Sequence, residues 1–152
     1  RQRQMCIRDS LEDTGEAVAV RVQMNNGGQR SDEIVLRYAP QASASRVGPY
    51  KHDGQVAVVT RATDNSLRKL FVYGGTFLTD YADAEGRVLV TNLDKNGPFE
   101  AAYFDQSVAV SGPLRTQVTL YAPQARYLTV NGAAWPFTPS GDYITFEGKT
   151  NY

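Results

Sequence analysis

Apolar and polar residues alternate along most of the chain, in short runs that are separated by turns. Successive side chains of a β-strand point to opposite faces, so each run predicts a strand with one apolar face. In the first run, the residues of that face are Val18, Val20, Val22 and Met24. An Asn/Gly-rich turn at residues 25–29 joins this run to residues 32–38, and two alternating runs around such a turn predict a β-hairpin.

Further runs of the same kind continue along the chain, with Gly, Pro, Asn or Asp between them. They occupy residues 54–61, 68–75, 76–81, 87–92, 99–105, 107–113, 116–121, 126–137 and 142–147. Short strands with a turn every 8–12 residues are typical of a β-sandwich or barrel, and no stretch keeps a clean helical period. We therefore predict an all-β fold, an antiparallel two-sheet β-sandwich of about ten short strands with little or no helix.

Length and composition narrow the class of protein. The 152 residues are enough for one domain. Hydrophobic residues make up 41% of the chain and charged residues 21%, which excludes a disordered protein. No apolar run approaches the ~20 residues that span a bilayer, so we expect no membrane span. Lys and Arg together number 16, as do Asp and Glu, and this balance argues against a nucleic-acid surface.

Residues 1–10 break the pattern, because they show neither apolar periodicity nor a signal peptide. They look like translated adapter sequence at the end of an assembled reading frame, and a genuine basic leader is the alternative. We therefore expect one domain over residues 11–152. The single cysteine, Cys6, has no partner for an internal disulfide. Because the chain starts without Met and stops at Tyr152 without a tail, we expect it to be the C-terminal part of a longer protein.

The pentapeptide YAPQA occurs twice, at Tyr38–Ala42 and at Tyr121–Ala125, each time after an alternating run. Proline has no N–H and holds the preceding residue in extended geometry, so this pentapeptide is a natural way to leave a sheet edge. The residues around the two copies do not align. We interpret them as two similar strand exits, and a duplicated module is the alternative.

The chain offers few residues for catalysis. Its only histidine, His52, precedes Asp-Gly, which is typical of a turn that enters a strand. A Ser-His-Asp triad needs no adjacency in sequence, but the G-x-S-x-G elbow is absent, and one His with one Cys does not make a zinc site. Asp80, Asp83 and Glu85 cluster at a turn, where carboxylates are normally solvated. We predict no catalytic residue in this chain.

One turn has the beginning of a calcium-binding pattern. Asn92, Asp94 and Asn96 stand at alternate positions before a glycine, as oxygen ligands do in a Ca²⁺ loop. Only Asp94 is charged, and Tyr103 occupies the position where a bidentate Glu is needed. A plain Asn/Gly turn is the favoured interpretation. Ca²⁺ is the alternative, and we expect no other cofactor.

Carbohydrate binding is the remaining chemistry that the residues suggest. Exposed aromatic rings cover the apolar faces of sugars while their polar tips form hydrogen bonds. The candidates for such contacts are Tyr50, Tyr81 and Trp135, with Tyr73 and Tyr103 as further aromatic residues. Trp135 and Phe137 stand two apart and share a strand face, which favours a core role for that pair.

Two stretches of the chain resemble a known family. Residues 53–78, DGQVAVVTRATDNSLRKLFVYGGTFL, hold a strand after Asp-Gly and a second strand that ends at Gly74-Gly75; the glycine pair predicts a bulge or a sharp corner. Residues 118–147 contain a V-N-G hairpin followed by P-F and D-Y-I-T-F. Over residues 16–148 the chain resembles the C-terminal β-sheet region of heparinase II/III-like polysaccharide lyases, through motifs that are structural and not chemical.

The resemblance implies a secreted or periplasmic enzyme that cleaves an acidic polysaccharide by β-elimination. In that family the catalytic Tyr and His lie mainly on a helical toroid and a central sheet, and none of them matches a position in this chain. We therefore expect a non-catalytic sandwich that packs beside the missing catalytic domain of its parent and contacts the polysaccharide. A stand-alone carbohydrate-binding module and a structural or adhesive domain are the alternatives.

Overall fold

A computed structural model of the chain describes residues 5–14, 17–26, 28–37, 44–83, 85–114 and 116–148. These residues form strands and turns without any helix, so the predicted all-β class is confirmed. Within the same residues, nothing helical is long and apolar enough to cross a membrane.

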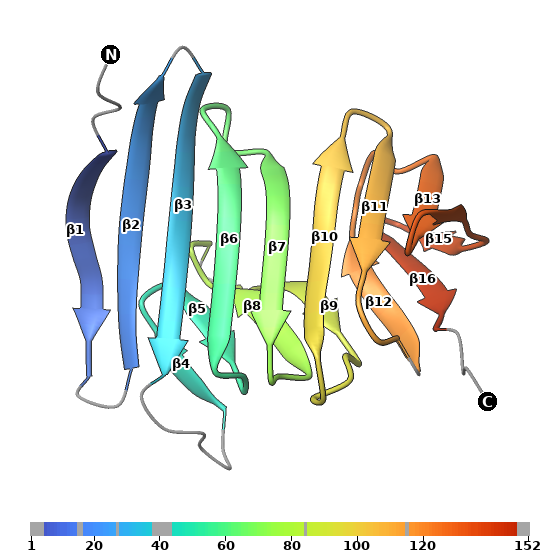
Figure 1. The fold of residues 1–152 in the computed structure, drawn as a ribbon, viewed down its shortest axis with the longest axis horizontal. Helices are drawn as coiled ribbons and strands as arrows, with labels where there is room; N and C mark the ends of the chain where they lie inside the picture. The colour runs from blue at the N-terminus through green and yellow to red at the C-terminus, as the bar shows by residue number, and fades with distance from the viewer. Residues whose placement is uncertain are drawn as a thin grey trace.

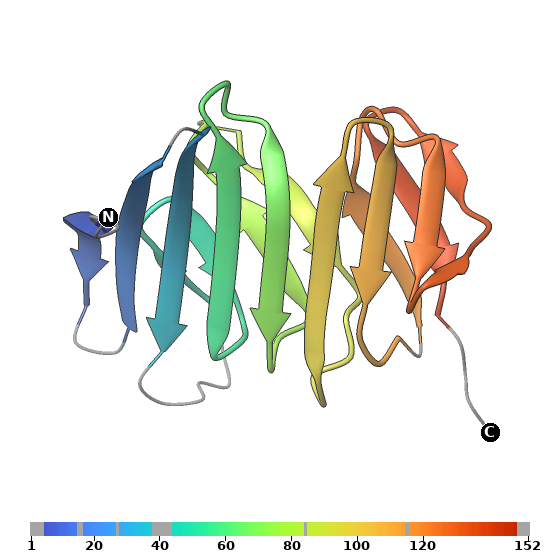
Figure 2. The same ribbon diagram turned by 45° about the horizontal axis from the view of Figure 1, so that its top comes forward.

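The strands form two sheets that pack face to face (Figures 1 and 2). In spatial order, the large sheet comprises β1 (Met5–Asp13), β2 (Ala17–Asn26), β3 (Gly28–Arg37), β6 (Val56–Ala62), β7 (Leu67–Tyr73), β10 (Pro98–Phe104), β11 (Ser107–Ser111), β13 (Tyr127–Val130) and β14 (Ala133–Ala134). The small sheet comprises β15 (Thr138–Ser140), β16 (Tyr143–Glu147), β12 (Gln117–Tyr121), β9 (Arg87–Thr91), β8 (Phe77–Asp80), β5 (Tyr50–His52) and β4 (Ser45–Val47). Among the described strands, neighbours pair antiparallel except β11 and β13, which pair parallel.

The core lies between the two sheets and follows the alternation of the sequence. In β6, Ala57 and Val59 point inward and are buried. The large sheet also contributes Leu70, Val72, Phe99, Ala101, Val108 and Val110, and the small sheet contributes Leu78, Val90, Val118, Leu120, Ile144 and Phe146. Apolar burial of this kind is the main stabilising term in folding.

Two of the places where the chain passes from one sheet to the other are adjacent corners. Gly54 separates β5 of the small sheet from β6 of the large sheet, and Gly74-Gly75 separates β7 from β8 on the return. The two corners touch, because a Cβ on Gly75 would lie 2.7 Å from the backbone nitrogen of Gly54. Gly74 has a φ of 71°, a conformation that glycine adopts without strain. The sharp corner predicted at Gly74-Gly75 is confirmed.

The predicted runs correspond to strands from β2 onward, but several strands were not predicted. β4, β5 and β15 have three residues each, which is too short for an alternation to stand out. β1 includes residues 5–10, which the predicted domain over residues 11–152 did not contain. It pairs with β2, and the pairing has two register shifts. An edge strand joins a sheet through backbone hydrogen bonds and needs no apolar pattern. The foreign origin of residues 1–10 stays a prediction.

The second YAPQA copy leaves β12 at Tyr121, where the strand ends and a turn follows. This agrees with the interpretation of the pentapeptide as a strand exit. The first copy, Tyr38–Ala42, lies outside the described residues.

Candidate functional site

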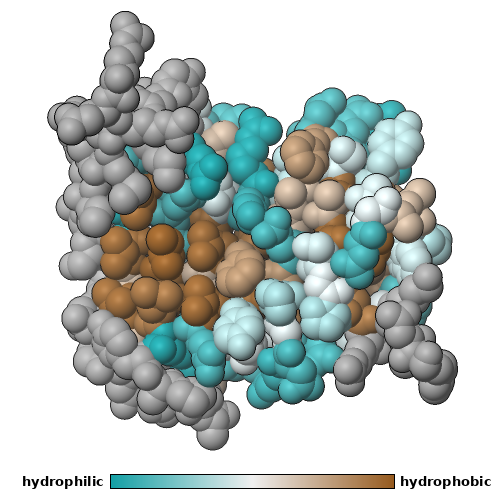
Figure 3. Space-filling view, in the orientation of Figure 1, coloured by the Kyte–Doolittle hydropathy of each residue, from teal (hydrophilic) through white to brown (hydrophobic). Residues whose placement is uncertain are grey.

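The outward-facing side of the large sheet carries an apolar surface, which we call the outer apolar face. Strand register places its residues in two rows that run across β2, β3, β6 and β7. One row is Val18, Leu36, Val56 and Tyr73, and the next is Val20, Ile34, Val58 and Phe71. Val22 extends the face along β2. Figure 3 shows a continuous hydrophobic area over the middle of these strands.

Solvent reaches this face in the isolated chain. Leu36 and Tyr73 are 40% and 44% exposed, and Ile34, Val58 and Phe71 are partly exposed. Strands that are apolar on both faces are usually covered on both sides, and monomeric proteins rarely expose large contiguous apolar patches. The outer apolar face therefore has the character of an interaction surface.

Polar and charged residues border the outer apolar face on one side, where Asp32, Thr60 and Lys69 form the next row. Asp32 accepts hydrogen bonds from Arg30 at 2.8 Å and from Thr60 Oγ1 at 2.6 Å. Lys69 pairs with Glu100 at 2.8 Å. An apolar centre with a polar border is the usual anatomy of a protein–protein interface.

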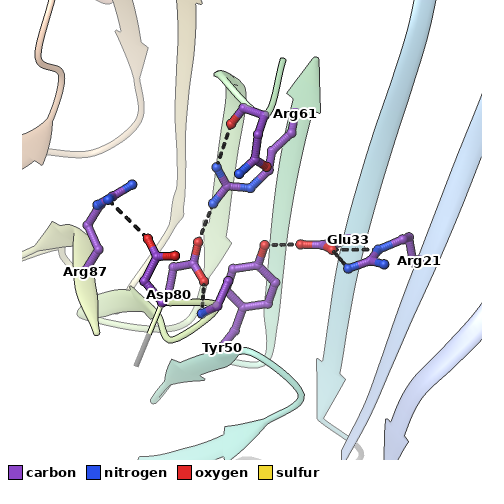
Figure 4. A network of polar contacts seen from close by, with 9 residues as sticks. Arg21, Glu33, Tyr50, Arg61, Asp80 and Arg87 are labelled. Atoms are coloured by element: carbon purple, nitrogen blue, oxygen red, sulfur yellow. Dashed lines mark hydrogen bonds and ion pairs between the residues drawn. The ribbon is translucent and has the colours of Figure 1, made fainter. Parts of the chain in front are cut away.

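A polar network crosses the interior between the two sheets (Figure 4). Tyr50 Oη donates to Glu33, and Glu33 also pairs with Arg21. On the opposite side of the same space, Arg61 pairs with Asp80. Burial, followed by the nearby Glu33 carboxylate, raises the pKa of Tyr50 far above its ordinary value. A tyrosine in this state holds its proton firmly, so the network fits a structural role better than proton transfer.

A pocket of about 400 Å³ opens at one end of the sandwich, between the β6–β7 turn and the β10–β11 turn. Its wall includes Arg61, Tyr103 and Tyr121 from the strands. The loops add Asp64, Asn65, Ser66, Asp105, Pro123 and Gln124. The second YAPQA copy thus lines a pocket as well as ending a strand.

The aromatic rings near this pocket are already in contact with protein groups. The guanidinium of Arg87 lies over the Tyr121 ring, 5.0 Å from its centre, and Tyr143 packs edge-on against the same ring at 5.6 Å. Tyr103 Oη donates to the backbone oxygen of Tyr121 at 2.9 Å. The pocket therefore offers hydrogen-bonding groups rather than an open stacking platform.

The three aromatic residues predicted to contact sugar do not come together. Tyr50 is 1% exposed and lies between the sheets. The Tyr81 ring lies beneath the guanidinium of Arg46, 5.0 Å from its centre. Trp135 packs against the core together with Phe137, and its Nε1 donates to the Glu147 oxygen at 2.8 Å.

Of the two further aromatic residues, Tyr73 belongs to the outer apolar face and Tyr103 lines the pocket. The predicted core role of Trp135 and Phe137 agrees with their packing.

The turn suggested for Ca²⁺ is held by its own hydrogen bonds. Asp94 Oδ1 accepts from the backbone N–H of Asn96 at 2.9 Å and from its Nδ2 at 3.0 Å, and the Asn92 oxygen accepts from Thr116 at 2.6 Å. In the part of the chain that the structure describes, no three His, Cys, Asp or Glu side chains gather to hold a metal.

His52 is fully buried, and neither ring nitrogen has a hydrogen-bond partner among the described residues. Burial, and then the charge of Arg37, lowers the pKa of His52 to about 4, against a smaller opposite effect of Asp53. Of the clustered carboxylates, Asp80 is buried and paired with Arg61, and Asp83 pairs with Arg87 at 3.2 Å on the surface. Glu85 is exposed. These groups do not converge on one cleft.

Sequence reasoning missed the pocket, because its residues come from separate turns that only the fold brings together. It also missed the outer apolar face, although the signal was present. Val56 and Val58 alternate with Ala57 and Val59, and an apolar pattern on both sides of one strand indicates that both sides need cover.

Comparison with known proteins adds no family assignment. A scan of the chain against protein-family models finds no match, and no curated protein matches it. The likeness to heparinase II/III-like lyases stays a prediction that rests on the residues quoted above.

Proposed function

We propose that this chain is a non-catalytic accessory domain that packs through its outer apolar face against another domain of a secreted carbohydrate-active enzyme. The observation that carries the proposal is the pair of apolar rows across β2, β3, β6 and β7. Covering these side chains with protein removes apolar surface from water, at roughly 25 cal/mol per Å² before the costs of association.

The titratable groups support the non-catalytic part of the proposal. Tyr50 and His52 are buried, and their pKa values are shifted away from the range useful for general acid or base chemistry near neutral pH. Asp80 neutralises Arg61 in the interior. Tyr50 and Asp80 each have an interior partner, Glu33 and Arg61.

The family part of the proposal rests on the sequence motifs. The Asp-Gly and Gly-Gly positions of the resemblance, Asp53, Gly54 and Gly75, form the double corner between the sheets. Because these residues shape the fold and do not form a catalytic site, they support an accessory role within a lyase-like parent. A secreted or periplasmic location, an acidic polysaccharide substrate and cleavage by β-elimination in the parent enzyme follow from the resemblance alone.

The interface is tested on the isolated chain with substitutions that keep strand propensity. Val20→Thr, Ile34→Thr and Val58→Thr together remove apolar surface while retaining β-branched side chains. We expect the wild-type chain to bind a hydrophobic fluorescent dye and to self-associate with rising concentration in sedimentation, because its partner is missing. The triple variant should do neither and should keep the same circular dichroism. A wild-type chain that stays monomeric and dye-free at high concentration contradicts the proposal.

The parent is tested by the sequence that flanks the chain in its gene. A helical toroid encoded next to the chain would support the lyase assignment. So would cleavage of an acidic polysaccharide by the longer protein, measured as the gain in absorbance from the new double bond. Cleavage by the isolated chain would contradict the accessory role.

A further inference from the structure

We propose that the pocket between the β6–β7 and β10–β11 turns binds a neutral polyhydroxylated ligand of about the size of one sugar ring. The volume of about 400 Å³ falls within the range of small-molecule sites, roughly 300–1,000 Å³. This site is separate from the outer apolar face, so either proposal can fail without the other.

The charges around the pocket argue for a neutral ligand. Arg61, Arg68 and Arg87 line it together with Asp64 and Asp105. Arg61 is already paired with the buried Asp80, and Arg87 with Asp83. The arginines therefore leave no excess positive charge, which recognition of a polyanion requires.

The polar groups of the pocket suit hydroxyl groups, which both donate and accept hydrogen bonds. Within the described residues, the Asp105 carboxylate and the Gln124 amide make no hydrogen bond to protein, and both side chains are exposed. Asp105 supplies acceptors and Gln124 supplies a donor pair and an acceptor. Arg61 lines the pocket and is held by its hydrogen bonds to the Asn65 oxygen at 3.0 Å and to Asp80.

The walls of the pocket are held in place before any ligand arrives. In the β6–β7 turn, the Asp64 carboxylate accepts from the Ser66 N–H at 3.0 Å and from its hydroxyl at 2.5 Å. On the other side, the hydrogen bond from Tyr103 to Tyr121 ties β10 of the large sheet to β12 of the small sheet. A site built from turns on rigid strands loses little entropy on binding.

The test is a titration followed by ¹⁵N–¹H NMR, with methyl glycosides of glucose, mannose and galactose as neutral probes. We expect at least one to give saturable shifts in the Gln124 side-chain amide and in the backbone amides of residues 105–107, 122, 124 and 125. The affinity should be on the order of 1 mM, because a single sugar unit makes few contacts. Glucuronate serves as the charged comparison and should bind no more tightly.

Asp105→Ala and Gln124→Ala should each weaken binding about tenfold, which corresponds to about 1.4 kcal/mol. Gln117→Ala, at the opposite end of β12, is the control and should bind as the wild type does. A disaccharide that binds more tightly than its single unit points to the end of a glycan as the source, and equal affinity points to a free sugar.

Three results would overturn the proposal. The first is the absence of saturable shifts with every neutral probe. The second is preference for glucuronate. The third is binding that Asp105→Ala and Gln124→Ala leave unchanged in spectra that show an intact fold.

Discussion

The backbone of Gly54 lies against the backbone of Gly75, so close that a Cβ on Gly75 would stand 2.7 Å from the nitrogen and 2.8 Å from the Cα of Gly54. Gly54 and Gly75 stand where the chain enters the large sheet at β6 and leaves it after β7. The contact joins β5–β6 to β7–β8, and it is possible because neither Gly54 nor Gly75 carries a Cβ.

Replacing Gly75 with Ala should destabilise the fold by about 3 kcal/mol, since backbone must move to make room for the methyl group. Gly141→Ala is the control, because a Cβ at Gly141 would meet nothing within 4 Å. Only the φ of 58° opposes this change, and it should lower the stability by about 1 kcal/mol. Urea unfolding of both variants gives the comparison. Equal losses of stability would mean that the contact between the corners is not tight.

Asp53 fastens the same corner. Its carboxylate accepts from the Thr76 N–H at 2.7 Å, from the Thr76 hydroxyl at 2.8 Å and from the Phe77 N–H at 3.4 Å. Burial alone raises the pKa of Asp53, but these hydrogen bonds and Lys95 outweigh it and lower the pKa. The stabilisation is therefore present above the unfolded pKa of about 3.9 and is lost as the pH falls below it.

Asp53→Asn should lower the free energy of unfolding by about 1–3 kcal/mol at neutral pH, because charge-assisted hydrogen bonds are lost. The difference between wild type and variant should shrink as the pH falls through the folded-state pKa of Asp53. Unfolding by urea at a series of pH values measures this, and a difference that stays constant down to the most acidic sample would refute the assignment.

His52 should make the fold sensitive to mild acid. Its pKa is lowered from 6.5 to about 4 by burial and by Arg37. As the pH falls from about 6.5 to about 4, the unfolded chain takes up a proton that the folded chain does not, so stability decreases, by about 3 kcal/mol in all. Below about 4 both states are protonated and the loss stops.

The chain has one histidine, so a single imidazole NMR signal reports the folded-state pKa directly. His52→Leu should keep the core filled and remove this part of the pH dependence, because it replaces a buried polar ring without hydrogen-bond partners among the described residues. An imidazole that titrates near 6.5 in the folded protein would show that the side chain is not buried as described.

Tyr50→Phe removes the hydroxyl that donates to Glu33 in the interior. In this variant Glu33 keeps its ion pair with Arg21 but loses the hydrogen bond from a buried hydroxyl. We therefore expect the free energy of unfolding to fall by about 1–3 kcal/mol. Tyr127→Phe, at a side chain that is 66% exposed, should change stability by less than about 0.5 kcal/mol. Thermal and urea unfolding measure the stability of both variants. Equal losses of stability would show that the Tyr50 network does not stabilise the fold.

The class of fold was predictable because period-two alternation is a local property. Val18, Val20 and Val22 were assigned to one face from spacing alone, and they share that face in the structure. The edge strand β1 was not predictable, since backbone pairing leaves little trace in side-chain pattern. The pocket was not predictable either, because Asp64, Asp105 and Gln124 meet only after two sheets have packed.

The interface is tested most directly by thiol labelling at its centre. In a Cys6→Ser background, Val58→Cys reports on the outer apolar face and Gln117→Cys reports on the opposite sheet. Both are labelled in the chain alone and in the longer polypeptide that includes the flanking sequence. We predict that labelling at position 58 slows at least about tenfold in the longer polypeptide, the equivalent of about 1.4 kcal/mol of protection, while position 117 reacts as before. Equal rates at position 58 in the two forms would contradict the account.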